Sequence, residues 1–450
     1  MPVFFVWKIF FLISCHFFFL PMVNVYVRKY KIVIRRRGGS MMTQFTEAKK
    51  AFAQSAWNQV LKVYGCTVRE LNTDIFKRPV QDMKHVLEDV GYAYSQLSNF
   101  RFNKQSKTLK NEDDIMVARD NAVKSYTTLL DVDEKNMKGL HGMAYVYYKF
   151  VIDVSGQKNM SKVMDLSRLD NFKEAEKWYQ KLLALDEMNM KGNYRLGKLY
   201  FTILNAWSPS FEAYLKEKHM SRRNVQNLAR VHFCKALVAY AAMTPQYKAA
   251  YAKYFAKTKY NLGNLCLSLC YDNSHKVWKF FSLNPNQPVP GYMAYGYNKE
   301  LEEALKQYFE VLNAYHIDVD NPLDASQFVK PKKEYDVSPK DVLYRLGCVY
   351  ATQYKRQCFT YGRQRADMAL AERGMYYLLV SLQYAWWMIK KGYNRNENYS
   401  YVSKKLVALC RLADMDITSE MIEALRADIP HYIEEPKKVY TKVQHKEALA

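Results

Sequence analysis

Two stretches of the chain that begin 53 residues apart have nearly the same pattern. Residues 122–147 read AVKSYTTLLDVDEKNMKGLHGMAYVY, and residues 175–200 read AEKWYQKLLALDEMNMKGNYRLGKLY. They align without a gap, and the shared positions are Ala122/Ala175, Tyr126/Tyr179, Leu129/Leu182, Leu130/Leu183, Asp133/Asp186 and Asn-Met-Lys-Gly at 136–139 and 189–192. A match of this length indicates repeated structural units, and such units define a whole fold.

The repeated unit is predicted to be a pair of helices. Leu196 and Tyr200 are four residues apart, so they lie on one face of a helix. Gly197 between them lets a neighbouring helix approach closely. Ala175 and Tyr179 supply the matching small and large surfaces on the second helix. Because helical periodicity dominates and no segment shows the sustained alternation of a strand, the sequence predicts an all-α fold.

The same signature recurs further along the chain at wider spacing. Tyr-x-Leu-Gly stands at 194–197, 260–263 and 344–347. One step of 53 residues before Met143-Ala144 lies Val90-Gly91, so the first two steps are equal and the third and fourth are successively wider. The widening indicates insertions or longer helices. It leaves open how many hairpins lie between residues 205 and 390.

Helix starts and loops are predicted from local composition. Asn171 followed by Glu174, and Ser338-Pro339 followed by Asp341, are typical of helix N-termini. Polar or Pro/Gly-rich stretches predict long insertions, and the chain ends predict capping helices. The predicted loops are 101–113, 154–169, 282–297 and 321–339, and the predicted capping helices are 44–64 and 397–427.

The repeat resembles the tetratricopeptide repeat (TPR). The residues that carry the resemblance are Leu-Gly-x-x-Tyr at 196–200, Ala-x-x-x-Tyr at 175–179 and the closing Leu185-Asp186. It covers residues 80–205 well and 245–390 loosely, and it implies an α-α superhelix, a solenoid of helical hairpins with long inter-helix insertions. The steps exceed the family's repeat of about 34 residues. The proline that usually follows the second helix is replaced by Glu134 and Glu187.

Residues 1–42 differ from the rest of the chain. The first forty hold seven phenylalanines, seven lysines or arginines and no acid, and residues 9–27 carry no charge. One interpretation is a signal anchor, long enough to span a membrane, whose basic flank keeps the following domain on the cytoplasmic face. The other, if the source is bacterial, is an untranslated leader included by a mis-called start ahead of Met41 and Met42. The solenoid then occupies residues 43–429, with a basic tail at 430–450.

The sequence contains no recognised catalytic or cofactor-binding motif. His-Glu-x-x-His, Gly-x-Ser-x-Gly, Gly-Lys-Ser/Thr and Gly-x-Gly-x-x-Gly are all missing from it. The eight cysteines are scattered, which favours a reducing, cytoplasmic environment. Cys266 and Cys270 share a helical face and are interpreted as core residues rather than as metal ligands. We therefore expect that the protein is not an enzyme and that it has neither a cofactor nor a metal site.

The candidate binding site follows from helix geometry. With about 100° per residue, Lys191, Tyr194 and Lys198 lie opposite Leu196, with Arg195 beside them. If leucine and tyrosine occupy the core side, this opposite side is left to line a groove. The alternative is a solvated polar face with partly buried tyrosines. The predicted groove residues are Lys191, Asn193, Tyr194, Arg195, Lys198, Tyr260, Asn261, Asn264, Tyr344 and Arg345.

These residues predict a protein-binding scaffold or adaptor. Arginine binds carboxylates in bidentate fashion and tyrosine offers flat area with one hydroxyl, which suits an extended acidic segment. The TPR resemblance implies that such a groove clamps a partner's terminal carboxylate, here with Lys191, Asn193, Arg195, Asn261 and Asn264. Without the seven basic residues of the leader the net charge is +23 − 7 = +16, and this charge with the many aromatics suggests RNA binding as the alternative. Apart from the leader and the tail, however, the basic residues are expected to be interleaved with acids. An enzyme without a recognisable motif is a second alternative.

Overall fold

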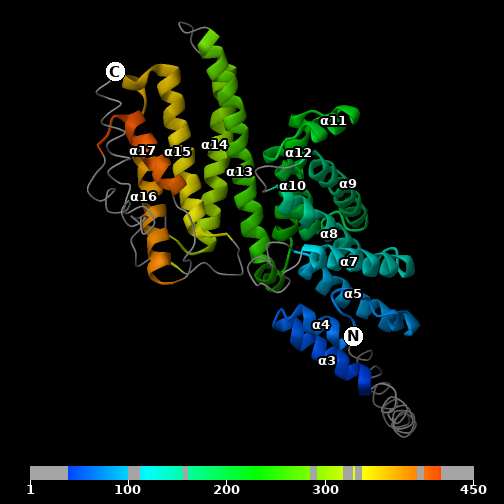
Figure 1. Cartoon of the computed structure of the whole chain (residues 1–450). Helices are drawn as coiled ribbons and strands as arrows, with labels where there is room; N and C mark the ends of the chain where they lie inside the picture. The colour runs from blue at the N-terminus through cyan, green and yellow to red at the C-terminus, as the bar shows by residue number, and fades with distance from the viewer. Residues whose placement is uncertain are drawn as a thin grey trace, which may run out of the picture. The chain divides into compact units, whose positions relative to one another are not determined.

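The computed structural model describes residues 39–99, 112–155, 161–283, 291–317, 328–329, 337–392 and 400–416. Every regular element in these ranges is an α-helix or a short 3-10 helix, and the helices pack against neighbours in sequence order (Figure 1). The predicted all-α class is therefore confirmed. Residues 1–38 of the predicted leader and the predicted tail at 430–450 lie outside the described residues.

None of the described helices is long and apolar enough to cross a membrane. The uncharged stretch at 9–27, on which the prediction of a signal anchor rests, lies outside the described residues. The first described helix, α3 (Gly39–Ala53), begins before Met41 and Met42.

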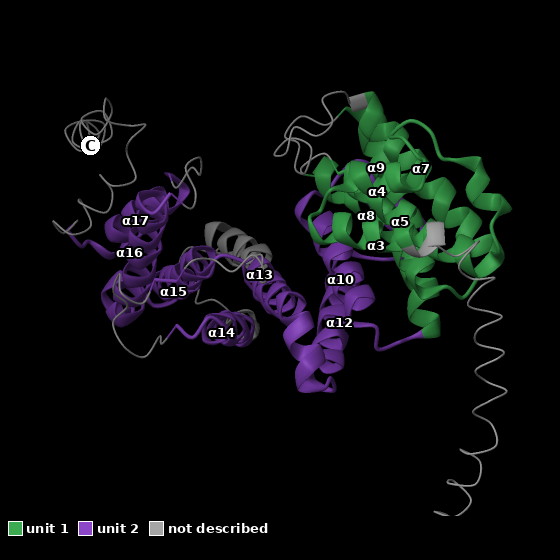
Figure 2. Cartoon of the chain, turned by 90° about the horizontal axis from the view of Figure 1, so that it is seen from below, with its two compact units in different colours: residues 1–185 green, residues 186–450 purple. Residues whose placement is uncertain are grey.

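The chain divides into two compact units, of which the first covers residues 1–185 (Figure 2). After α3, it contains α4 (Trp57–Val63), the 3-10 helix η1 (Thr73–Lys77), α5 (Val80–Leu97), α7 (Glu112–Val132), α8 (Met137–Ser155) and α9 (Lys162–Leu185). The closest pairs are α5 with α7 and α8 with α9, which are the hairpins that the sequence repeat predicts. Helix α7 also packs on α8, and α5 packs on α8.

The second unit covers residues 186–450, and its described residues form three further hairpins. These are α10 with α12, α13 with α14, and α15 with α16, so the wide third and fourth steps hide no additional hairpin among the described residues. The bounds are α10 (Met190–Asn205), α11 (Pro209–Glu217), α12 (Arg222–Ala241), α13 (Pro245–Leu283), α14 (Gly291–Ala314), α15 (Pro339–Tyr361), η2 (Arg363–Arg365), α16 (Met368–Lys390) and α17 (Ser400–Ala413). The first helices of successive hairpins also contact each other, α10 with α13 and α13 with α15.

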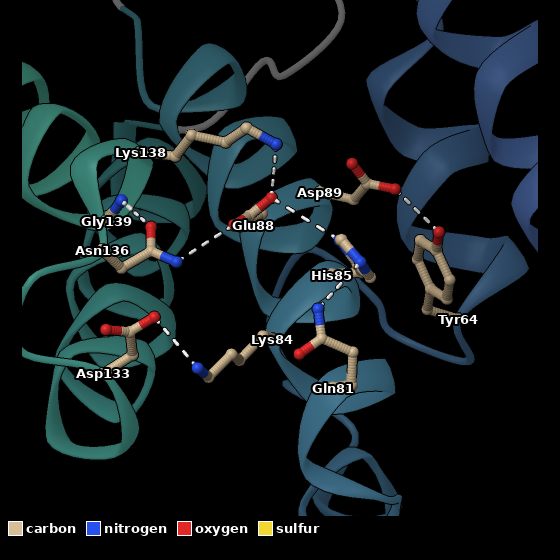
Figure 3. Close-up of polar contacts among 10 residues, drawn as sticks. All are labelled: Tyr64, Gln81, Lys84, His85, Glu88, Asp89, Asp133, Asn136, Lys138 and Gly139. Atoms are coloured by element: carbon tan, nitrogen blue, oxygen red, sulfur yellow. Dashed lines mark hydrogen bonds and ion pairs between the residues drawn. The ribbon is translucent and has the colours of Figure 1, made fainter. Parts of the chain in front are cut away.

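The repeated Asn-Met-Lys-Gly motif begins the first helix of a hairpin. The Asn189 side chain caps α10 by accepting a hydrogen bond from the Gly192 backbone N–H at 2.9 Å. Asn136 does the same for the Gly139 N–H at 2.8 Å, immediately before α8 (Figure 3). A side-chain oxygen at this position satisfies one of the N–H groups that a helix start leaves without a partner. The motif thus fixes where each of these helices begins.

Glycines on the first helices receive a large side chain from the second helices. A Cβ added at Gly91 or Gly142 would collide with the ring of Tyr126, which lies between them. In the second unit an added Cβ would come within 2.9 Å of Phe233 at Gly197 and within 2.7 Å of Tyr308 at Gly263. At Gly347 it would come within 2.6 Å of Leu378. The predicted close approach of neighbouring helices is confirmed at Gly91, Gly197, Gly263 and Gly347, and Gly142 makes a further contact of this kind.

Carboxylates of the first unit tie its helices together (Figure 3). Glu88 on α5 accepts hydrogen bonds from Lys138 at 2.6 Å and from Asn136 at 3.1 Å, and both partners lie at the start of α8. Lys84 donates to Asp133 at 2.9 Å, at the end of α7. Each of these acids has a basic or amide partner within the unit, so these contacts stabilise the packing of the helices.

The predicted helix start at Asn171 is wrong. Helix α9 begins more than two turns earlier, at Lys162, where Ser161 accepts a hydrogen bond from the Met164 N–H at 3.2 Å. Asn171 is buried in the middle of α9, and its amide donates to the Ser167 carbonyl oxygen and accepts from Arg119. A cap-like polar residue can satisfy its hydrogen bonds inside a helix when it faces a buried partner.

Two of the predicted loops are shorter than expected. Helix α9 occupies the second half of 154–169, and α13 and α14 enter 282–297 from both ends. The start predicted at Ser338 is confirmed, since α15 begins at Pro339. Within 321–339 the described residues are too few to test the predicted loop, and 101–111 lies outside them.

Replacing Gly142 by alanine is expected to lower the melting temperature of the protein. The new methyl group would overlap the buried Tyr126 ring, and overpacking of this kind costs about 1–3 kcal/mol. Circular dichroism during thermal unfolding measures the change. In a Tyr126→Leu background the same Gly142→Ala change should cost less, because the shorter side chain leaves room. An equal loss in both backgrounds would contradict the role given to this contact.

Candidate functional site

The first half of α13 is an extension that the first helix of the preceding hairpin, α10, does not have. Helix α10 begins at Met190, shortly before Gly197, whereas α13 begins at Pro245, several turns before the equivalent Gly263. This extra length accounts for most of the widened third step. It brings Tyr251 and Tyr254 alongside α10.

Lys191 and Arg195 on α10 contact these tyrosines. The Lys191 ammonium lies 4.9 Å from the ring centroid of Tyr251 and 5.5 Å from that of Tyr254. Burial alone would raise the pKa of Tyr254, but the positive charges of Arg195, Lys191 and Lys253 outweigh it and lower that pKa. Cation–π contacts hold these long side chains in place. The result is an ordered basic surface next to aromatic rings.

Lys198 lies one turn further along α10. Its ammonium donates a hydrogen bond to the Asn261 side-chain oxygen on α13 at 2.7 Å. Burial, together with the positive charges of Lys257 and Arg345, lowers the pKa of Lys198 from 10.5 to about 8. The charged groups that act on this lysine are therefore themselves cations, and they come from α13 and α15.

Arg345 on α15 completes the cluster. Its guanidinium lies 5.5 Å from the ring centroid of Tyr344. Burial opposes its charge, yet the nearby phenols of Tyr260 and Tyr308 raise the pKa of Arg345 above its ordinary value. The Arg345 Nε is buried without a hydrogen-bond partner among the described residues. We call Lys191, Arg195, Lys198, Lys257 and Arg345 the basic face; each of these side chains is half-buried.

Several predicted groove residues lie in the packed interior instead of on an open face. Asn193 is fully buried, donates to the carbonyl oxygens of Glu187 and Asn189, and lies 2.9 Å from the His232 ring nitrogen. Tyr194 is buried against Phe233. The prediction assumed that packing occupies one side of α10. In the structure α12 and α13 both pack on it, so less of its surface remains.

The predicted residues on α13 and α15 have mixed surroundings. Asn261 is buried and orients Lys198, and Asn264 accepts a hydrogen bond from the Tyr308 hydroxyl at 2.8 Å. Tyr260 packs against Tyr308 with ring centroids 6.0 Å apart. Tyr344 makes an edge contact with Tyr401 at 4.8 Å. All ten predicted residues lie in the second unit, and the basic face includes four of them.

The expectation that acids are interleaved with the basic residues is wrong for one long segment. Residues 188–271 contain thirteen lysines and arginines and two acids, Glu212 and Glu217. Both acids belong to α11, so α10, α12 and the part of α13 that precedes Asp272 contain none. A concentrated charge of one sign attracts an oppositely charged partner.

Some cations of this segment pair with acids from elsewhere in the second unit. The pairs are Lys235–Glu187 and Arg230–Glu300, both at 2.8 Å, and Lys259–Glu310 at 2.6 Å. These three cations lie outside the basic face. Within the basic face, Lys191 and Arg345 contact aromatic rings and Lys198 contacts an amide.

Lys257, Tyr251 and Tyr254 are site residues that the groove prediction missed. The prediction transferred positions from one Tyr-x-Leu-Gly motif to the next, and these three precede the motif on α13. The acid-free run with tyrosines at 247, 251, 254 and 260 was a signal that could have identified them.

The described cysteines are free thiols, and most of them are buried. Among the described residues, no group of three or more potential metal ligands comes together. Cys266 and Cys270 are both buried on α13, as expected. Burial raises the pKa of Cys270 to about 12, which keeps the thiol protonated and unreactive at neutral pH.

No protein-family model matches the chain, and none of the curated proteins is similar to it. The basis for a functional proposal is therefore the geometry of the second unit. That geometry defines an all-helical protein whose first helices place half-buried cations side by side.

Replacing Lys198 by methionine is expected to change how stability depends on pH. The pKa of Lys198 is about 8 in the folded state and 10.5 in the unfolded state. Below pH 8 the lysine is charged in both states, and the buried charge then destabilises the folded state by its full amount. The wild type regains up to about 3 kcal/mol as the pH rises from 8 to 10.5. The melting temperature of Lys198→Met relative to wild type should therefore fall across that range.

The control is Lys124→Met, which removes an exposed lysine from α7. Its difference from wild type should stay constant between pH 7 and 10.5. A constant difference for Lys198→Met as well would show that Lys198 has an ordinary pKa.

Proposed function

We propose that the protein is an adaptor with a TPR-like solenoid, and that its basic face binds an extended acidic segment of a partner protein. The packing order supports the solenoid. Within each unit, a second helix packs on its own first helix and on the next one, and first helices contact each other. Repetition of this pattern stacks hairpins with their first helices on one side.

The observation that carries the proposal is the convergence of cations from α10, α13 and α15, of which α10 and the part of α13 before Asp272 contain no acid. Lys198, Lys257 and Arg345 come together from three helices, although burial and mutual repulsion disfavour the charge of Lys198. An arrangement of like charges costs stability, and a bound anion would remove that cost. Carboxylates of an acidic segment supply such anions.

The state of the basic side chains favours affinity. Half-buried side chains held over tyrosine rings have already lost part of their rotamer freedom. Binding therefore costs less entropy than it does for fully exposed lysines. The TPR resemblance adds that a terminal carboxylate is a suitable anchor.

The surroundings of the tyrosines favour an acidic peptide over RNA. Stacking of single-stranded bases needs open ring faces. Lys191 covers Tyr251 and Tyr254, and Tyr194 is buried. Among the described tyrosines of residues 188–270, only Tyr247 is exposed, at 62%, and one open ring is a poor platform for successive bases. RNA binding is thus the competing outcome of the test below.

The proposal includes a cytoplasmic location. The described cysteines are all free thiols, including the exposed Cys234. Free thiols are typical of a reducing compartment. The membrane-anchor interpretation concerns residues 9–27 alone.

A fluorescent twelve-residue peptide rich in Asp and Glu is expected to bind the full chain. The Lys191→Glu/Arg195→Glu variant should lose at least about tenfold in affinity, because two attractive charges become repulsive. The control is Lys124→Glu, on an exposed part of α7, which changes charge outside the site. Fluorescence anisotropy measures both, and circular dichroism verifies folding.

Two further ligands sharpen this experiment. The same peptide with an amidated C-terminus shows whether a terminal carboxylate is the anchor. A mixed-sequence single-stranded RNA tests the alternative. The adaptor proposal is wrong if the RNA binds more tightly than the peptide with a steep salt dependence, or if the double variant binds the peptide as wild type does.

A further inference from the structure

We infer that Lys198, Lys257 and Arg345 form a phosphate-binding site, so that the segment held by the basic face carries a phosphorylated side chain. This inference rests on the proposed function and specifies the partner's chemistry. The three residues come from α10, α13 and α15; α13 contacts both other helices, and the charges of Lys257 and Arg345 both act on Lys198.

The geometry around Lys198 orients its ammonium. One of its three N–H groups donates to Asn261 at 2.7 Å. The Asn261 amide in turn donates to the Lys257 carbonyl oxygen at 2.7 Å, one turn earlier on α13. Asn261 is thus fixed at both ends, and it holds Lys198 on the face of α13 that carries Lys257.

The number of charges favours a dianion. One carboxylate brings a single negative charge to a point where two cations already act on a third. A phosphate monoester carries a charge of about −1.5 to −2 at pH 7 and offers three strong acceptor oxygens. It therefore matches the concentration of positive charge better than a single aspartate or glutamate of the same segment.

The hydrogen-bond donors also match. The Arg345 Nε is a buried charged N–H without a partner among the described residues, and such groups usually have an acceptor. Guanidinium binds phosphate oxygens in bidentate fashion, and lysine binds them as a point charge. Arg345 and Lys198 together provide more donors than a carboxylate can use.

Occupation of the site is linked to protonation of Lys198. The charged groups that act on Lys198 are Lys257 on α13 and Arg345 on α15. A dianion placed among them stabilises the ammonium form, so binding raises the pKa of Lys198. Without ligand, Lys198 loses its proton as the pH rises through about 8. Phosphate binding should therefore weaken above that pH.

The test compares two acidic peptides that differ at one central residue, phosphoserine or glutamate, using the full chain and isothermal titration calorimetry. The phosphopeptide should bind at least about tenfold more tightly at pH 7. Lys198→Met should remove most of this difference, whereas Lys124→Met should leave it unchanged. Lys198→Arg should retain tight binding at pH 7, and its affinity should stay constant up to pH 9, where that of wild type falls.

The outcomes separate this inference from the adaptor function. If both peptides bind equally, and Lys191→Glu/Arg195→Glu still abolishes binding, the phosphate site is wrong and the adaptor proposal stands. If neither peptide binds, both proposals fail. Competition by inorganic phosphate distinguishes a site for the free ion from one that needs the peptide: millimolar phosphate that displaces the peptide supports recognition of the phosphate group itself.

Discussion

The structure depends on the contact between a glycine of one helix and a bulky side chain of its partner. Gly91 and Gly142 enclose Tyr126, Gly197 receives Phe233, and Gly263 receives Tyr308. A ring that fills the space left by a missing Cβ fixes both the separation and the register of two helices. Because the same contact recurs from hairpin to hairpin, each new pair of helices within a unit packs on the one before it.

This contact explains how far the sequence predicts the fold. The all-α class followed from helical periodicity, and the first helices followed from Tyr-x-Leu-Gly, because the close approach of two helices depends on a few neighbouring residues. The capping role of Asn-Met-Lys-Gly became clear only in the structure. The second helices of the later hairpins were harder to predict, although Ala229-x-x-x-Phe233 and Ala304-x-x-x-Tyr308 repeat the earlier Ala-x-x-x-Tyr. The helix start predicted at Asn171 was wrong because the sequence does not distinguish a polar residue buried inside a helix from one that caps a helix.

The candidate site was predicted only in part, because it depends on which helices are neighbours. Helical geometry placed Lys191, Arg195 and Lys198 on one side of α10, and the motif identified Arg345. Lys257 and the tyrosines of α13 lie on a helix that starts much earlier, relative to its glycine, than α10 does. The length of a helix extension decides what lies beside it, and the repeat pattern does not encode that length.

The basic face is costly for the fold, and this cost is an argument for function. Lys198 would be better accommodated as an apolar residue, because burial and two nearby cations disfavour its charge. Elsewhere in the second unit the chain provides carboxylate partners, as for Arg230 and Lys259. At the basic face, tyrosines orient Lys191 and Arg345 and an asparagine orients Lys198, and these partners leave the positive charges in place. The repulsion between these cations lowers the stability of the free protein, and a bound anion removes that repulsion. The same residues therefore destabilise the free protein and stabilise its complex with an anionic ligand.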